Sequence, residues 1–158
     1  MDDSIDKSRV FSQDRYDNDS TGDYLNAPMS KEQYENFINE LLEAECIIKK
    51  DFETKDLFQA CQPVEEVARS GFDAPRYGAM KPIGLQDPNS GKRPYAVVQL
   101  RAENKEKTAW NLVGFQTNLT FKEQDRVFRM IPGLENATFA RYGVMHRNTF
   151  IEAPRLLD

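Results

Sequence analysis

One cysteine lies where its thiol could take part in a reaction. Cys61 ends a short, mostly apolar run and precedes Pro63, which opens a helical pattern over 64–69 that Gly71 closes. Unpaired N–H groups at the start of a helix stabilise negative charge, so a thiol placed there is favoured as the reactive thiolate. A lone cysteine is also commonly a small buried apolar residue, and that structural role for Cys61 stays open.

Other ionisable groups could assist a thiolate at Cys61. Glu65 and Glu66 fall in the first turn of the expected helix, where carboxylates stabilise the helix start and could also share the proton of the thiol. His146 could serve as a general base, but it lies far along the chain and equally suits a surface position beside Arg147. Two cysteines, one histidine and no CxxC spacing predict neither a disulfide framework nor a metal site.

Charge is divided unevenly along the 158 residues. Residues 1–68 carry 7 Lys or Arg and 17 Asp or Glu, whereas residues 69–158 carry 14 and 9. A basic segment suits contact with phosphate, and several of its cations adjoin aromatic residues, as in Arg76-Tyr77 and Arg141-Tyr142. Ordinary solvated charge would give the same pattern, so both interpretations stay open.

The first elements that must position these residues are an irregular segment and a helix. Residues 1–29 are polar and rich in Asp, Ser and Asn, which predicts irregular structure. Ser30 and Gln33 form a capping-box pattern, after which apolar residues recur at helical spacing. This pattern predicts an amphipathic helix over about 31–45 with its apolar stripe on the core.

The second half of the chain is expected to form a sheet. β-rich runs at 94–101 and 109–115 are joined by a charged loop and predict a hairpin. Residues 77–85 have a strand-like texture that Gly and Pro interrupt, and a further strand is expected at 137–144. The tail over 145–158 is expected to be irregular.

A second capping box precedes another helix. Thr120 and Glu123 mark its start, and Pro132 with Gly133 marks its stop. The elements together predict one small domain of the α/β class, in its α+β form, with helices packed on a mixed, largely antiparallel sheet.

Several classes of protein are excluded. The chain has no G-x-G-x-x-G fingerprint and no P-loop, so it holds no complete nucleotide-binding loop of those kinds. No apolar run approaches the ~18 residues of a membrane span, and the first residues lack the pattern of a signal peptide. These features predict a cytoplasmic protein that has no membrane as a partner.

Five motifs resemble those of the TrmFO family, the folate- and flavin-dependent tRNA uracil-5 methyltransferases. They read MKPIGL at 80–85, GKRPYAVVQLR at 91–101, VGFQT at 113–117, QDRVFRMIPGLENA at 124–137 and RYGVMHRNTFI at 141–151. The resemblance spans nearly the whole chain, but only the inserted middle domain of the family. It implies a single domain excised from a larger flavoprotein, with residues 30–158 as an α/β insertion domain and the Rossmann FAD-binding domain absent.

The resemblance also implies the reaction and its components. In the family, methylenetetrahydrofolate supplies the one-carbon unit, FAD carries and reduces it, and NAD(P)H recharges the flavin. The product is 5-methyluridine at tRNA position 54. The partners of this chain would then be tRNA and the missing FAD-binding domain, and no cofactor is expected on this chain alone.

The family places a cysteine where Cys61 stands. Its pattern, Phe-Glu-Gly-Cys-Leu/Met-Pro-Ile-Glu, is similar to Phe-Gln-Ala-Cys-Gln-Pro-Val-Glu at 58–65, with Gln59, Ala60 and Gln62 departing from it. A thiolate that adds to C6 of uracil makes C5 nucleophilic, and the same thiol could instead help to remove the C5 proton. Cys61 is therefore the candidate nucleophile or proton-transfer residue, while a non-catalytic tRNA-docking module with a structural Cys61 is the alternative.

The resemblance turns the cations into candidates for contact with tRNA, namely Lys81, Lys92, Arg93, Arg101, Arg126, Arg129, Arg141 and Arg147. Three aromatic residues could stack on a displaced base, although core packing is the favoured role for each of them: Tyr77, Tyr95 and Trp110. His146, Arg147 and Asn148 are expected near the junction with the flavin domain. Their pattern is closer to TrmFO than to its relative GidA, which makes modification of a different base the less favoured alternative.

Overall fold

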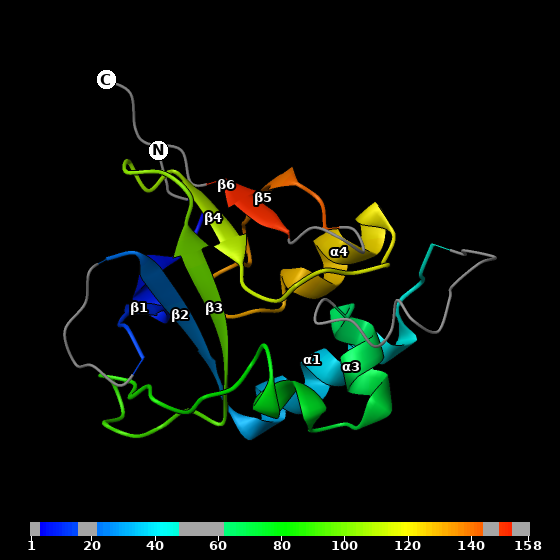
Figure 1. The fold of residues 1–158 in the computed structure, drawn as a ribbon, viewed down its shortest axis with the longest axis horizontal. Helices are drawn as coiled ribbons and strands as arrows, with labels where there is room; N and C mark the ends of the chain where they lie inside the picture. The colour runs from blue at the N-terminus through cyan, green and yellow to red at the C-terminus, as the bar shows by residue number, and fades with distance from the viewer. Residues whose placement is uncertain (1–3, 16–21, 48–61, 144–148, 153–158) are drawn as a thin grey trace.

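The computed structural model describes residues 4–15, 22–47, 62–143 and 149–152, and in this part of the chain the strands form one sheet (Figure 1). The sheet has six strands in the order β1-β2-β3-β4-β6-β5, and each neighbouring pair is antiparallel. The strands are β1 Phe11–Ser12, β2 Tyr24–Met29, β3 Ala96–Ala102, β4 Ala109–Leu112, β5 Thr138–Arg141 and β6 Phe150–Glu152. The expected β3–β4 hairpin is confirmed.

Three helices in the described residues gather on one side of the sheet (Figure 1). They are α1 Lys31–Glu43, α3 Val64–Ser70 and α4 Phe121–Phe128, and two short 3-10 helices, η1 Lys7–Arg9 and η2 Ala74–Tyr77, accompany them. Helices on one face of an antiparallel sheet make an α+β architecture, so the predicted fold class is confirmed.

The start of α1 follows from its sequence. The Ser30 hydroxyl accepts a hydrogen bond from the Gln33 N–H at 3.2 Å, and the Gln33 side chain accepts one from the Ser30 N–H at 2.8 Å. This reciprocal pair is the predicted capping box. The apolar stripe of α1 faces the core through Tyr34, Phe37, Ile38 and Leu41, all of them inaccessible to solvent.

The prediction of an irregular segment over 1–29 is wrong for β1 and β2. β2 pairs with β3 along its whole length, from Tyr24 opposite Arg101 to Met29 opposite Ala96. The Asn26 side chain, which is buried, donates hydrogen bonds to the carbonyl oxygens of Phe11 and Gln13 and accepts one from Gln99. Polar composition misleads here because these buried amides hydrogen-bond one another and the backbone.

Two further expectations fail. The tail contains β6, which lies between β4 and β5 and pairs with both. Residues 77–85 form no strand, because η2 and a series of turns occupy 74–85. These turns close locally, with the Gly78 and Met80 N–H groups both donating to the Pro75 carbonyl oxygen. The Gly and Pro residues of this segment thus terminate regular structure instead of interrupting a strand.

Gly114, which follows β4, lies so close to Ala79 that a side chain at position 114 would overlap with it. Gly114 has φ +81°, and a Cβ added to it would lie 2.6 Å from the Cβ of Ala79. Gly91 shares the left-handed conformation, with φ +69°, but a Cβ there would meet nothing within 4 Å. A side chain at either position would suffer backbone strain, but only a side chain at Gly114 would also overlap with a neighbour. Substitutions at the two positions therefore distinguish the two effects.

We expect Gly114→Ala to lower the free energy of unfolding by about 3 kcal/mol, from left-handed strain together with overpacking. Gly91→Ala, the matched control, should cost about 1 kcal/mol because it adds only the strain. Urea denaturation of both variants measures the difference. Equal losses at the two positions would contradict the close approach of Gly114 to Ala79.

Candidate functional site

The segment 115–120 connects several elements of the fold, among them the start of α3, which follows the predicted cysteine in the sequence. Its carbonyl and N–H groups bond to residues on several sides, including Val64 N–H to the Gln116 oxygen at 2.8 Å and Ile47 N–H to the Asn118 oxygen at 2.7 Å. The Thr149 N–H donates to the Phe115 oxygen at 3.2 Å. We call residues 115–120 the junction segment, because it connects the end of α1, the start of α3 and the sheet.

Glu65 fastens α3 to the junction segment. Its carboxylate is buried and accepts hydrogen bonds from the Thr117 hydroxyl at 2.6 Å and the Asn118 N–H at 2.7 Å. Burial disfavours the charged form more than these hydrogen bonds favour it, so the pKa of Glu65 is raised. Glu66, by contrast, forms an ion pair with Arg69 on the surface of α3. Of the two predicted first-turn acids, Glu65 is thus the one with a positioning role.

A cavity of about 360 Å³ lies beside the start of α3. Its walls come from α3, from η2 and the turn after it, and from the end of β4, and the lining residues are Gln62, Val64, Val67, Pro75, Gly78, Ala79, Gly114 and Gln116. Gln62 follows Cys61 directly in the sequence. We call this space the α3 cavity; its mainly apolar lining and its volume suit a small ligand.

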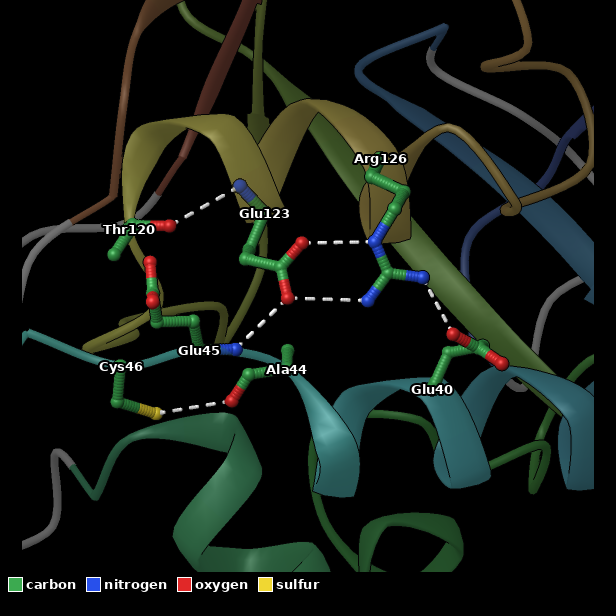
Figure 2. Close-up of polar contacts among 7 residues, drawn as sticks. All are labelled: Glu40, Ala44, Glu45, Cys46, Thr120, Glu123 and Arg126. Carbon is green, nitrogen blue, oxygen red and sulfur yellow. Dashed lines mark hydrogen bonds and ion pairs between the residues drawn. The ribbon is translucent and has the colours of Figure 1, made fainter.

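The start of α4 departs from the predicted capping box (Figure 2). The Thr120 hydroxyl accepts from the Glu123 N–H as expected, but the Glu123 carboxylate accepts from the Glu45 N–H at 2.8 Å instead of from Thr120. Arg126 donates to the same carboxylate, and its hydrogen bonds, followed by that of Glu45, lower the pKa of Glu123 to about 2. Glu123 therefore joins α4 to the end of α1.

Cys46 lies beside this contact and is the cysteine whose surroundings the structure describes. Its half-buried thiol lies 3.8 Å from the Ala44 oxygen, and burial, followed by the nearby charge of Glu65, raises its pKa (Figure 2). A raised pKa keeps the thiol protonated and weakly nucleophilic. Cys46 therefore fits a packing role.

The predicted catalytic and junction residues lie outside the described residues. They are Cys61, His146, Arg147 and Asn148. Their predicted roles stay predictions, as does the role of the Arg141 side chain, although Arg141 itself ends β5.

Two of the predicted RNA-binding cations are engaged within the fold. Arg126 bridges Glu40 at 2.5 Å and Glu123 at 2.8 Å, which joins α1 to α4 (Figure 2). Arg129 donates to the Ala137 oxygen at 3.0 Å, and its guanidinium lies 5.4 Å from the centre of the Phe139 ring. Both side chains have intramolecular roles that explain their presence without RNA.

Four other candidates are exposed, namely Lys81, Lys92, Arg93 and Arg101. Lys81 and Arg93 line one cavity of about 420 Å³ together with Arg76, Tyr77, Pro82, Ile83 and Pro94. We call this space the Tyr77 pocket. The predicted set of cations omits Arg76, although the Arg76-Tyr77 dipeptide stands out in the sequence.

The three aromatic candidates for base stacking differ in exposure. Trp110 is 1% exposed and packs in the core, so a stacking role for it is wrong. Tyr95 packs edge-on against Tyr34, and the Arg76 guanidinium lies 3.6 Å from its ring centre, which covers one face of the ring. Tyr77 is 81% exposed. Tyr77 alone of the three presents an accessible ring.

No group of three or more His, Cys, Asp or Glu side chains is placed to hold a metal ion in the described part of the chain. No helix within it combines the length and the apolar character needed to span a membrane.

Comparison with known proteins shows which family has sequences similar to this chain. A family model described as glucose inhibited division protein A matches residues 1–158. Three relatives carry the name methylenetetrahydrofolate–tRNA-(uracil-5-)-methyltransferase TrmFO. They come from Acetivibrio thermocellus (59% identity over 155 residues), Fervidobacterium nodosum (57% over 155) and Geobacter sulfurreducens (56% over 156). The alignments cover 98–99% of this chain but 35–36% of each relative, so the chain spans about a third of their length.

The buried carboxylate of Glu65 predicts a characteristic pH dependence. Because its pKa in the folded protein exceeds the ordinary value of 4.5, the folded state holds the proton more tightly, and the free energy of unfolding should fall as the pH rises above 4.5. Glu65→Gln removes this titration and should flatten the fall, as measured by urea denaturation from pH 4.5 upward.

The matched control is Glu66→Gln, which removes a carboxylate from the same turn but from its surface. The difference in slope between Glu65→Gln and Glu66→Gln isolates the buried group from all other titrations. An identical pH dependence in the wild type and in Glu65→Gln would contradict a raised pKa for Glu65.

Proposed function

The chain belongs to the glucose inhibited division protein A family, and from that premise we propose that it is the substrate-binding insertion domain of a flavin-dependent tRNA (uracil-5-)-methyltransferase. The observation that carries the proposal is the identity of 53–59% to proteins of that name across nearly the whole chain. The reaction proposed for the full-length protein transfers a one-carbon unit from methylenetetrahydrofolate to C5 of uridine 54 in tRNA.

Cys61 is assigned the role of activating the uracil. Its thiolate bonds to C6, which moves electron density to C5 so that C5 can attack the one-carbon unit. Loss of the C5 proton and departure of the thiolate restore the ring, and the hydride that converts the transferred methylene to a methyl group would be supplied by the reduced flavin of the full-length protein. The α3 cavity supports this assignment because Gln62, the residue after Cys61 in the sequence, contributes to its wall, and its volume of about 360 Å³ is enough for a small ligand.

The rigidity of the α3 cavity supports the same assignment. Glu65 and the Val64 N–H tie the first turn of α3 to Thr117, Asn118 and Gln116 in the junction segment. A reacting group gains rate when its surroundings hold it in one orientation. The retained acid of the family pattern, Glu65, thus serves to fix the helix that follows the cysteine.

Binding of FAD and NAD(P)H is assigned to another part of the full-length protein. A dinucleotide site of the usual kind needs a parallel βαβ unit with a glycine-rich turn at a helix start. All strand pairs in the described residues are antiparallel, so this part of the chain does not fit that kind of site. The proposed partner is therefore the flavin domain of the same polypeptide. Residues near His146 are proposed to lie at the junction of the two domains.

In a second candidate function, the domain binds tRNA but contributes no catalytic residue. In this version the domain docks tRNA through exposed cations such as Lys81 and Arg93, while Cys61 only packs. Exposed cations without a described ion pair favour docking under both versions, so they do not distinguish them. Substitution of Cys61 does.

We expect Cys61→Ser in the full-length protein to reduce formation of 5-methyluridine at least a thousandfold, because a serine hydroxyl stays protonated at neutral pH and adds poorly to C6. The affinity for unmodified tRNA should change less than twofold. Mass spectrometry of nucleosides from digested tRNA measures the product, and filter binding measures the affinity.

Cys46→Ser is the matched control, since Cys46 is half-buried and its raised pKa keeps the thiol protonated. It should retain full methylation. Normal methylation by Cys61→Ser would contradict the catalytic role and support the non-catalytic docking function. A modified base other than 5-methyluridine in tRNA treated with the wild type would contradict the proposed reaction itself.

A further inference from the structure

The Tyr77 pocket combines an exposed aromatic ring with positive charge. Tyr77 is 81% exposed, and its side chain makes no ring contact or hydrogen bond with the described residues. Arg76, Lys81 and Arg93 line the same cavity, and no Asp or Glu is among the lining residues. A site with three cations and no carboxylate is complementary to an anion.

The cations differ in how they are held. Arg76 is fixed, because its Nε donates to the Tyr95 oxygen at 2.8 Å and its guanidinium stacks on the Tyr95 ring. Lys81 and Arg93 are exposed and have no ion pair within the described ranges. In this respect they differ from Arg126 and Arg129, which act within the fold. Their charge remains available to a ligand.

The walls of the pocket are ordered by the backbone. The Lys81 N–H donates to the Gly78 oxygen at 3.2 Å, and the neighbouring Met80 oxygen accepts from the Val97 N–H of β3 at 3.1 Å. On the other side, Arg15 donates to the Ile83 oxygen at 2.6 Å. A pocket held in this way loses little entropy when a ligand binds.

We propose that the Tyr77 pocket binds one nucleotide of single-stranded RNA, with its base stacked on Tyr77 and its phosphate at Lys81 and Arg93. This inference rests on the proposed function, in which the substrate is a tRNA whose target lies in a loop. Unpaired bases of RNA loops are commonly held by stacking on aromatic side chains. Ile83 and the two prolines supply the apolar wall for the edge of the base.

The high exposure of the Tyr77 side chain favours an RNA strand over a free small molecule as the ligand of the pocket. A protein usually buries 70–90% of a small ligand that it binds tightly. A nucleotide inside an RNA strand instead keeps its neighbouring backbone outside the site, and the exposed ring of Tyr77 is compatible with such partial burial of the ligand. The folate substrate, which also carries an aromatic ring and carboxylates, is the competing occupant that the experiment must separate.

The test uses the full-length protein with unmodified tRNA and compares Tyr77→Ala, Tyr77→Phe and the double variant Lys81→Gln/Arg93→Gln. Tyr77→Ala should weaken tRNA binding about tenfold, and Tyr77→Phe should restore it because the ring is retained. The double variant should lower the slope of log affinity against log salt by about 1.4, or 0.7 for each lost phosphate contact on a single strand.

Lys105→Gln and Lys122→Gln are the matched controls, since both are exposed cations outside the pocket. Each should leave affinity within twofold. Circular dichroism confirms folding of every variant, which is expected because Tyr77, Lys81 and Arg93 all project from the surface.

Two results would overturn the inference while leaving the proposed function intact. One is tRNA affinity in Tyr77→Ala equal to that of the wild type while the wild type methylates tRNA. The other is unchanged tRNA affinity together with a raised KM for methylenetetrahydrofolate, which would give the pocket to folate. Absence of both tRNA binding and methylation in the wild type would overturn the proposed function and this inference together.

Discussion

The attachment of α3 to the junction segment is the constraint on which the candidate site depends. α3 has seven residues, too few to be stable as an isolated helix, so its position must come from tertiary contacts. Glu65 supplies two of them through Thr117 and Asn118, and the Val64 N–H supplies a third through Gln116. These contacts fix the start of α3, the helix that follows the predicted cysteine in the sequence.

The same segment links the site to the sheet and to the other helices. Cys46 pairs with Leu119 in an isolated bridge, the Thr120 N–H donates to the Glu45 oxygen, and Gln124 of α4 donates to the Leu119 oxygen. The junction segment is thus shared by α1, α3 and α4. Gln116 of the same segment lines the α3 cavity.

Local signals in the sequence were sufficient for the helices but not for the order of the strands. The capping box at Ser30 formed as predicted because both partners are close in the chain. The Glu123 carboxylate instead accepts a hydrogen bond from the Glu45 N–H. Glu45 is distant in the chain, so no local sequence pattern indicates this contact. β6 was missed for a related reason, since its place between β4 and β5 is decided by pairing and not by its own residues.

Composition also predicted a basic surface without saying which cations are available. Arg126 and Arg129 look equivalent to Arg93 in the sequence, yet carboxylates, a carbonyl oxygen and an aromatic ring already satisfy them. Likewise Trp110 and Tyr77 look equivalent as aromatic residues, but burial removes one and exposes the other. Among the candidates that the structure describes, five have no side-chain contact of these kinds, namely Tyr77, Lys81, Lys92, Arg93 and Arg101. Of these five, Tyr77, Lys81 and Arg93 line one pocket. An exposed ring and two cations that have no ion pair in the described part of the chain contribute little to the stability of the domain itself, so their convergence is better explained by a ligand than by folding.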